Sequence, residues 1–295
     1  MFHKILICSD GSEYAQNAAL LGSEIARRFQ SEVLGLHVFD LSIITAGDVG
    51  VCSIPVSQEA MDNMMKSQRE AAERVITPIF EQLERPYRML QELGNPVDSI
   101  VQVAQREQAD LILVGHQGMT GLKELFLGSV SYSVLQHAHC PVLVERGPAK
   151  PFGRILLTSD ASAGAERAAS LAFALAQRFD ACLTVLNIAE PSGWFAAEEP
   201  NPNPVEAAEE HIAAERGERA VEESIQAAAK ATGVAYQLRE ERGHPGKTIV
   251  HYAKNGQFDL IVMGSRGLGG LESLLLGSVS NYVARHAHCS VLVAR

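Results

Sequence analysis

Lys4-Ile5-Leu6-Ile7-Cys8-Ser9-Asp10, an apolar run that ends in an acid, returns 150 positions later as Arg154-Ile155-Leu156-Leu157-Thr158-Ser159-Asp160. Further segments repeat in the same order at nearly the same offset: Asp110–Gly115 as Asp259–Gly264, Leu127–Ser131 as Leu276–Ser280, and His137–Cys140 as His286–Cys289. Matches in one order at one spacing indicate a duplicated domain, because the period is too long for a solenoid unit. Gly and Pro concentrate between 146 and 153, which predicts a linker there and domains at 1–147 and 154–295.

Within each half, short apolar segments alternate with segments of helical periodicity. In the first half we expect strands at 4–9, 32–39, 86–92, 110–114 and 141–145. The helices between them are expected to keep Leu21, Ile25 and Phe29 on one face, then to span 58–84 and 96–107, and to begin again near Ser129. The second half repeats the pattern, with Leu171, Leu175 and Phe179 on the first helix and a second strand at 182–188. Strands that are apolar throughout and separated by helices predict an α/β sandwich of about five parallel strands in each half.

The repeated acid and the repeated glycines fall where such a fold binds ligands. Ligands of open α/β sheets lie outside the carboxyl ends of the strands, where the strand order reverses. We expect the second and third strands on one side of the first, and the fourth and fifth on the other. The crevice then lies between Asp10 and Gly115 in the first half, and between Asp160 and Gly264 in the second.

A glycine pattern follows the fourth strand of each half. It reads Gly115-x2-Gly118-x9-Gly128-Ser129 and, again, Gly264-x2-Gly267-x9-Gly277-Ser278. Glycine lets backbone approach a ligand closely, and we expect each serine to be the N-cap of a helix that continues Val-Ser. The free N–H groups of such a helix start favour a phosphate group. The pattern is neither a Walker nor a Rossmann motif, and the alternative interpretation is three turn glycines and a cap without a ligand.

These residues resemble the universal stress protein family, whose nucleotide-binding members carry Gly-x2-Gly-x9-Gly-Ser/Thr. The resemblance covers essentially the whole chain as two tandem domains, including the closing segments Cys140–Val144 and Cys289–Val293. It implies an α/β sandwich of strand order 3-2-1-4-5 that binds ATP where the order reverses. It also implies that Asp10 and Asp160 meet the adenosine part, and that the backbone around Val38 and Ile188 meets the adenine.

The resemblance further implies a set of residues that hold the ribose and the phosphates in each half. These residues are Gly115, Gly118, Gly128, Ser129, Val130 and Ser131 in the first half, and Gly264, Gly267, Gly277, Ser278, Val279 and Ser280 in the second. Inside the first glycine pair, Gln117 in the first half corresponds to Arg266 in the second. A guanidinium offers stronger bonds to a polyphosphate than an amide does, so we hypothesise that the second site binds ATP more tightly. The alternative is that these are solvated loop residues.

Two weaker signals bear on metals. His137-x-His139-Cys140 and His286-x-His288-Cys289 contain soft ligands, but three crowded at a helix-to-strand junction rarely supply a tetrahedral zinc site. We interpret them as histidines that favour a helix C-terminus, followed by a small buried cysteine, and assign no metal ligand among the protein residues. A divalent ion at the nucleotide sites is expected to be Mg²⁺ or Mn²⁺ carried on the phosphates.

Composition excludes several classes of function. Of the 295 residues 46% are hydrophobic and 20% charged, and the net charge is -10, which argues against nucleic acid and anionic membrane surfaces as partners. No apolar run is long enough to span a membrane, the first residues do not resemble a signal peptide, and the five widely spaced cysteines form no disulfide framework. We therefore expect a cytoplasmic protein.

Three functions remain open. The first is a regulatory ATP-binding protein whose nucleotide state is read by a partner protein of unknown identity. The second is an enzyme; we expect at most slow ATP hydrolysis, because no general base, Walker pair or nucleophile elbow is present, and His116 has Ser265 as its counterpart. The third is an assembly module without nucleotide. The final strands, 141–145 and 290–294, would be sheet edges, so we expect the halves to dock through them as a pseudo-dimer, with a further homodimer left open.

Overall fold

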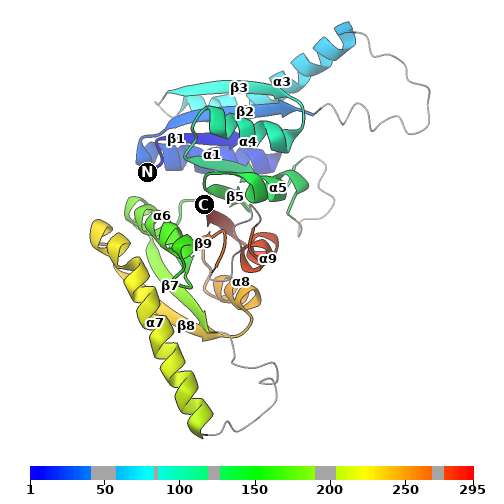
Figure 1. The fold of residues 1–295 in the computed structure, drawn as a ribbon. Helices are drawn as coiled ribbons and strands as arrows, with labels where there is room; N and C mark the ends of the chain where they lie inside the picture. The colour runs from blue at the N-terminus through cyan, green and yellow to red at the C-terminus, as the bar shows by residue number, and fades with distance from the viewer. Residues whose placement is uncertain (41–57, 83–85, 119–126, 190–203, 268–275) are drawn as a thin grey trace, which may run out of the picture. The chain divides into compact units, whose positions relative to one another are not determined.

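The computed structural model describes residues 1–40, 58–82, 86–118, 127–189, 204–267 and 276–295. These residues divide into two compact units, Met1–Pro151 and Phe152–Arg295 (Figure 1). Within the described ranges, no helix combines the length and the apolar character needed to cross a membrane.

Strands and helices alternate in both units. The first unit contains β1 (Lys4–Cys8), α1 (Glu13–Phe29), β2 (Glu32–Phe39), α3 (Gln58–Glu81), β3 (Tyr87–Leu93), α4 (Pro96–Arg106), β4 (Leu111–Gly115), α5 (Ser129–His137) and β5 (Val142–Glu145). The second contains β6 (Arg154–Thr158), α6 (Ala163–Phe179), β7 (Cys182–Ala189), α7 (Pro204–Thr232), β8 (Tyr236–Arg242), α8 (Pro245–Asn255), β9 (Leu260–Gly264), α9 (Ser278–His286) and β10 (Ser290–Ala294).

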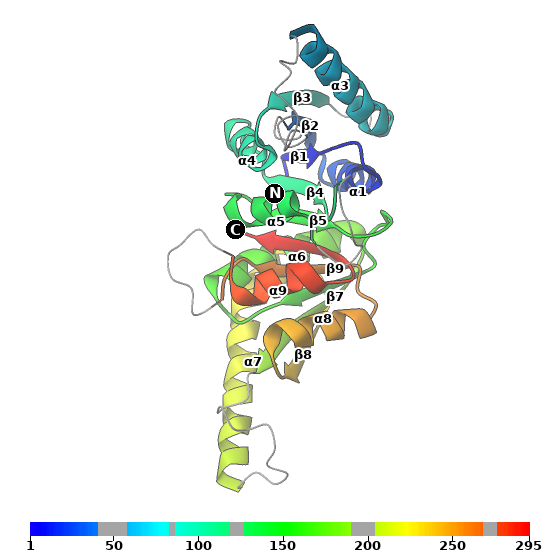
Figure 2. The ribbon, with the colours of Figure 1, turned by 90° about the vertical axis from the view of Figure 1, so that its right-hand side faces the viewer.

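Each unit has a parallel sheet with its first strand in the middle. The order is β3-β2-β1-β4-β5 in the first unit and β8-β7-β6-β9-β10 in the second. Leu6 on β1, for example, pairs in register with Leu34 on β2 and with Ile112 on β4. In the second unit α6 and α7 pack together on one face of the sheet, and α8 and α9 on the other (Figure 2). The predicted α/β fold, with strand order 3-2-1-4-5 in each repeat, is confirmed.

The central strands are buried because helices cover both faces of the sheet. Ile5, Leu6 and Ile7 on β1 have no exposed surface, and the same holds for Ile155, Leu156 and Leu157 on β6. The alternation of the strands with amphipathic helices explains this: burial of apolar side chains on both faces is the main force that holds the layers together.

The first helix of each unit begins and ends in the same way. Ser12 and Ser162 are N-caps whose hydroxyl oxygens accept hydrogen bonds from the backbone N–H of Ala15 and Ala165. The expected inner face is present, since Leu21, Ile25, Leu171, Leu175 and Phe179 are buried, whereas Phe29 is half-buried and packs edge-on against Phe2.

A carboxylate at the amino end of the fourth strand ties it to the first strand. Asp110 Oδ2 accepts hydrogen bonds from the backbone N–H of His3 (2.6 Å) and Lys4 (2.9 Å). Asp259 Oδ2 accepts equivalent bonds from Gly153 and Arg154, both at 2.8 Å. This repeated clamp lies at the opposite end of the sheet from the glycine patterns, so its role is to hold the register of the central strands.

Candidate functional site

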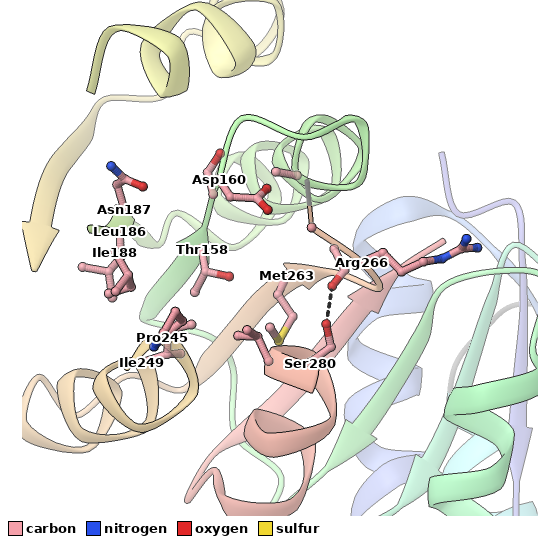
Figure 3. A pocket seen from close by; sticks show the side chains of 15 residues that line it. Thr158, Asp160, Leu186, Asn187, Ile188, Pro245, Ile249, Met263, Arg266 and Ser280 are labelled. Carbon is pink, nitrogen blue, oxygen red and sulfur yellow. Dashed lines mark hydrogen bonds between the residues drawn. The ribbon is translucent and has the colours of Figure 1, made fainter. Parts of the chain in front are cut away.

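The second unit contains a cavity of about 360 Å³ at the carboxyl ends of β6, β7 and β9 (Figure 3). Its apolar lining residues are Ala165, Leu186, Ile188, Pro245, Ile249, Met263 and Val279, and its polar or glycine lining residues are Thr158, Ser159, Asp160, Asn187, Gly264, Arg266, Gly267 and Ser280. A volume of roughly 300 to 1,000 Å³ with an apolar wall and a few polar groups is typical of small-molecule sites. β6 is the strand at which the order reverses, so the cavity occupies the crevice expected for this fold.

Most of the residues predicted for the second site lie on this cavity. They are Asp160, Ile188, Gly264, Arg266, Gly267, Val279 and Ser280. Gly277 and Ser278 do not line it directly, but they form the start of α9, from which Val279 and Ser280 do. Sequence reasoning missed several lining residues: Thr158, Ser159, Ala165, Leu186, Asn187, Pro245, Ile249 and Met263. The sequence could have indicated Pro245 and Ile249 as lining residues, because they are one turn apart at the start of the helix that follows the third strand.

The acid that follows the first strand bridges two parts of the site. Asp160 Oδ1 accepts a hydrogen bond from the backbone N–H of Ser162 at 3.1 Å, which holds the turn into α6. Its Oδ2 lies in the space that a Cβ atom at Gly267 would occupy. In the first unit, Asp10 Oδ1 bonds the N–H of Ser12 at 3.0 Å, and Oδ2 lies against Gly118 in the same way. The carboxylate therefore faces the glycine loop from across the crevice, where it can accept hydrogen bonds from ligand hydroxyl groups.

The third glycine, and not the serine, is the N-cap of the last helix in each unit. α5 begins at Ser129 with Gly128 as its cap, and α9 begins at Ser278 with Gly277 as its cap. The prediction that the serines are N-caps is therefore wrong by one residue. The reason is a backbone contact: the N–H of Gly277 donates to the Ser265 carbonyl at 2.8 Å, and an added Cβ would lie 3.2 Å from that oxygen.

This cap leaves the helix start available to an anion. A glycine has no side chain to accept hydrogen bonds from the first N–H groups of the helix, and none is made by the cap residue in either unit. Unsatisfied N–H groups at a helix N-terminus, together with the helix dipole, favour a negatively charged ligand. Val279 and Ser280, in the first turn of α9, line the cavity.

The second serine of the pattern bonds the end of the preceding strand. Ser280 Oγ donates to the carbonyl oxygen of Gly264 at 2.8 Å (Figure 3), and Ser131 Oγ donates to that of Gly115 at 2.6 Å. Both serines are buried. The hydroxyl thus fixes the helix start to the strand, and its oxygen faces the crevice as part of the wall.

Arg266 lines the cavity, but its guanidinium is directed away from it. Figure 3 shows the side chain leaving the side of the cavity that is opposite Leu186 and Ile188. Its carbonyl oxygen accepts a long hydrogen bond from Ser162 Oγ at 3.5 Å, so its backbone joins the loop to the turn before α6. The corresponding Gln117 in the first unit is buried.

The first unit presents its predicted site residues at the same strand ends. Asp10 follows β1, Val38 lies near the end of β2, and Gly115 ends β4, while Gly128, Ser129, Val130 and Ser131 form the cap and first turn of α5. Gly118 faces Asp10 as Gly267 faces Asp160. The structure therefore places the predicted residues of the first unit at the ends of the strands and at the helix start that correspond to those of the second unit.

His116, the candidate for acid–base chemistry, is a buried neutral residue. Its ring packs edge-on against Tyr14, with the ring centres 4.4 Å apart. Burial, together with the charge of Arg146, lowers the pKa of His116 to about 4. A histidine with this pKa and this packing is uncharged at neutral pH and does not supply a proton to a ligand.

The histidine–cysteine segments end the last helix of each unit. Nδ1 of His137 donates to the carbonyl oxygen of Ser133, and Nδ1 of His286 to that of Tyr282, both at 2.8 Å. Cys140 and Cys289 are buried. In the part of the chain that the structure describes, no group of three or more His, Cys, Asp or Glu side chains could hold a metal ion.

Comparison with known proteins gives one family. The model of the universal stress protein family matches residues 1–146 and again 151–295. A universal stress protein of Thermus aquaticus is 41% identical over 149 residues, covering 50% of this chain and 100% of that protein. The crystal structure of a universal stress protein from Archaeoglobus fulgidus matches with a TM-score of 0.68 at 24% identity, covering 99% of this chain and 96% of that one. A universal stress protein solved in complex with cAMP matches 50% of this chain and 99% of its own, at 25% identity and a TM-score of 0.39.

Proposed function

This chain belongs to the universal stress protein family, and we propose that it is a cytoplasmic stress-response protein that binds ATP in both tandem domains and acts as a regulatory module. The observation that carries the proposal is the arrangement of the second cavity. A carboxylate, Asp160, faces a glycine loop and the uncapped start of α9 across a space of about 360 Å³.

The two ends of this cavity suit the two ends of a nucleotide. The apolar wall formed by Leu186, Ile188, Pro245, Ile249 and Met263 fits a planar base. The start of α9 and the backbone around Gly267 fit the phosphates, because both offer backbone N–H groups to an anion. Asp160 lies between them, where an acceptor for the ribose hydroxyl groups is needed.

A divalent ion would enter with the phosphates. Asp160 is the one carboxylate among the lining residues of the cavity, and one carboxylate together with substrate phosphates is a common way of holding Mg²⁺. We propose Mg²⁺ or Mn²⁺ on this basis, with the phosphates as its main ligands.

Regulation is favoured over catalysis. The described lining of the second cavity contains no histidine or lysine that could act as a general base or a phosphate clamp, and His116 in the first unit is held neutral against Tyr14. Binding stabilises the conformation that holds ATP better, and a partner protein would read that conformation.

The test is to identify and follow the bound nucleotide. Purified protein is denatured, the released nucleotide is identified, and the native protein is incubated with Mg-ATP while phosphate release is measured. We expect about two adenine nucleotides per chain at saturation without multiple turnovers, and none in the variant that combines Asp10→Ala with Asp160→Ala. Multiple turnovers would support the alternative that the chain is an ATPase. A wild-type chain that binds no nucleotide would contradict the proposal and support the alternative of an assembly module without nucleotide.

A further inference from the structure

Among the positions at which the two units differ beside the proposed nucleotide, one lies on the second strand. Near the end of the second strand, the first unit has His37 and the second has Asn187. Each pairs in register with the third strand of its own unit, His37 with Gln91 and Asn187 with Glu240. Asn187 lines the cavity of the second unit and lies on its rim (Figure 3).

The wall next to this position is built by the same hydrogen bonds in both units. The N–H of Ser9 donates to the carbonyl of Leu36 at 2.9 Å, and that of Ser159 to Leu186 at 3.0 Å. Each serine hydroxyl then accepts from the N–H two residues later at 3.2 Å. Ser159 and Leu186 are lining residues of the second cavity, and this matching set of bonds gives His37 the place in the first unit that Asn187 has in the second.

His37 carries a polar atom that no described residue satisfies. His37 is 93% buried, and its Nδ1 lies 2.8 Å from the carbonyl oxygen of Ser9. A carbonyl oxygen only accepts, so Nδ1 is the donor in this contact, and in the tautomer that this bond selects Nε2 is an acceptor. Nε2 is buried without a hydrogen-bond partner among the residues that the structure describes. An unsatisfied buried acceptor is costly, and it needs a donor to approach it.

Asn187 is a different kind of group. Its amide nitrogen makes a long contact of 3.5 Å with Glu240 Oε2, and an amide side chain can both donate and accept. It therefore accommodates a ligand with or without a donor at this point. The imidazole of His37, in the tautomer that its bond to Ser9 selects, accommodates only a ligand that presents a donor.

We infer that His37 is a specificity-determining residue of the first site, whose Nε2 accepts a hydrogen bond from a hydroxyl or amino group of the adenosine part of the ligand. The inference rests on the proposed nucleotide binding. It gives the two sites of one chain different ligand selectivity: the first rejects nucleotides that lack the donor, and the second tolerates them. Adenosine offers two sources of a donor, the ribose hydroxyl groups and the amino group of the base.

Ligand analogues test this without perturbing the fold. The first site is measured alone in the Asp160→Ala chain and the second alone in the Asp10→Ala chain, by calorimetric titration with ATP, 2′-deoxyATP, 3′-deoxyATP and inosine triphosphate. At the first site we expect one analogue to bind about tenfold or more weakly than ATP, because it leaves Nε2 unpaired. The two deoxy analogues report the ribose, and inosine triphosphate reports the amino group of the base. We define the analogue ratio as the dissociation constant of that analogue divided by that of ATP. At the second site this analogue ratio is expected to be smaller than at the first.

Reciprocal variants then assign the difference to this position. His37→Asn is expected to reduce the analogue ratio of the first site to that of the second, and Asn187→His is expected to raise the ratio of the second site. A ratio is informative because a merely structural change weakens all four ligands alike. Equal ratios at the two wild-type sites, or ratios that do not follow the exchange, overturn the inference while leaving ATP binding intact. A wild-type chain that binds no ATP at all overturns the proposed function, and the inference with it.

Discussion

Replacing Gly118 or Gly267 by alanine is expected to weaken binding at one nucleotide site each and leave the fold unchanged. An added Cβ at Gly118 would lie 2.5 Å from Asp10 Oδ2, which is 0.9 Å inside an ordinary contact of 3.4 Å, and one at Gly267 would overlap Asp160 Oδ2 in the same way. Neither glycine has a backbone conformation that excludes alanine, so the carboxylate is the part that must move.

The magnitude follows from what the carboxylate loses when it moves. A hydrogen bond to a charged group contributes about 1.5–3 kcal/mol, so displacing Asp160 from a bound ligand should weaken binding by about ten- to a hundredfold. The carboxylate would also leave the N–H of Ser162, which holds the turn before α6 at 3.1 Å. This second bond is a single, partly buried hydrogen bond, so we expect its loss to lower the melting temperature by only a few degrees.

Calorimetric titration with Mg-ATP, together with the melting temperature of each variant, measures both effects. The wild type should bind two equivalents of ATP, and Gly118→Ala or Gly267→Ala one equivalent with high affinity. Gly153→Ala is the matched control: its added Cβ would also face a carboxylate oxygen, Asp259 Oδ2, but at an ordinary 3.4 Å and at the other end of the sheet. Folded Gly118→Ala and Gly267→Ala chains that still bind two equivalents with wild-type affinity would refute the reasoning.

Four further changes separate stability from binding. Gly264→Ala places a Cβ 2.7 Å from the backbone carbonyl carbon of Gly164, where nothing can rotate away, so urea titration should show a loss of about 1–3 kcal/mol in the stability of the second unit. Asp259→Ala removes the carboxylate oxygen that accepts hydrogen bonds from two backbone N–H groups at 2.8 Å. It should lower the free energy of unfolding by about 2 kcal/mol in the same assay, without changing ATP affinity. The pKa of His116 is about 4 in the folded chain, below its ordinary value, so the unfolded chain binds more protons between these values. Stability should therefore fall as the pH drops from about 6.5 to 4, by up to about 1.4 kcal/mol per pH unit, and His116→Phe should remove this contribution from the melting curves. Arg266→Gln should change ATP affinity by less than about threefold, because the guanidinium is directed away from the cavity; a larger loss would show that it turns inward when phosphates bind.

The fold was predictable because its determinants are local and repeated. Apolar strands such as 4–8 and 111–115, spaced by amphipathic helices, leave a parallel sheet as the architecture that buries them all. The duplication provided a second copy of the same pattern of strands and helices. The glycine spacing in both copies indicated the strand ends at which a ligand would lie.

What the sequence could not supply depends on contacts between distant segments. The cap of α9 falls on Gly277 because of a bond to the carbonyl of Ser265, which the sequence does not display. Leu186, Pro245 and Ile249 form one apolar wall only after the sheet and the crossover helix have assembled. The direction of Arg266 is a choice of rotamer, and no spacing rule fixes it.

The two sites keep the same backbone and differ in the side chains around it. The aspartates, the three glycines and the serine that bonds the strand end make the same contacts in both units. Other equivalent positions carry different side chains: Tyr14 in the first unit corresponds to Gly164 in the second, and His37 corresponds to Asn187. A cradle made of backbone N–H groups and one carboxylate tolerates such exchanges, because its geometry does not depend on them. Under the proposed function, two copies can therefore retain affinity for one class of ligand while their selectivity diverges, and one chain would respond to two different nucleotide mixtures.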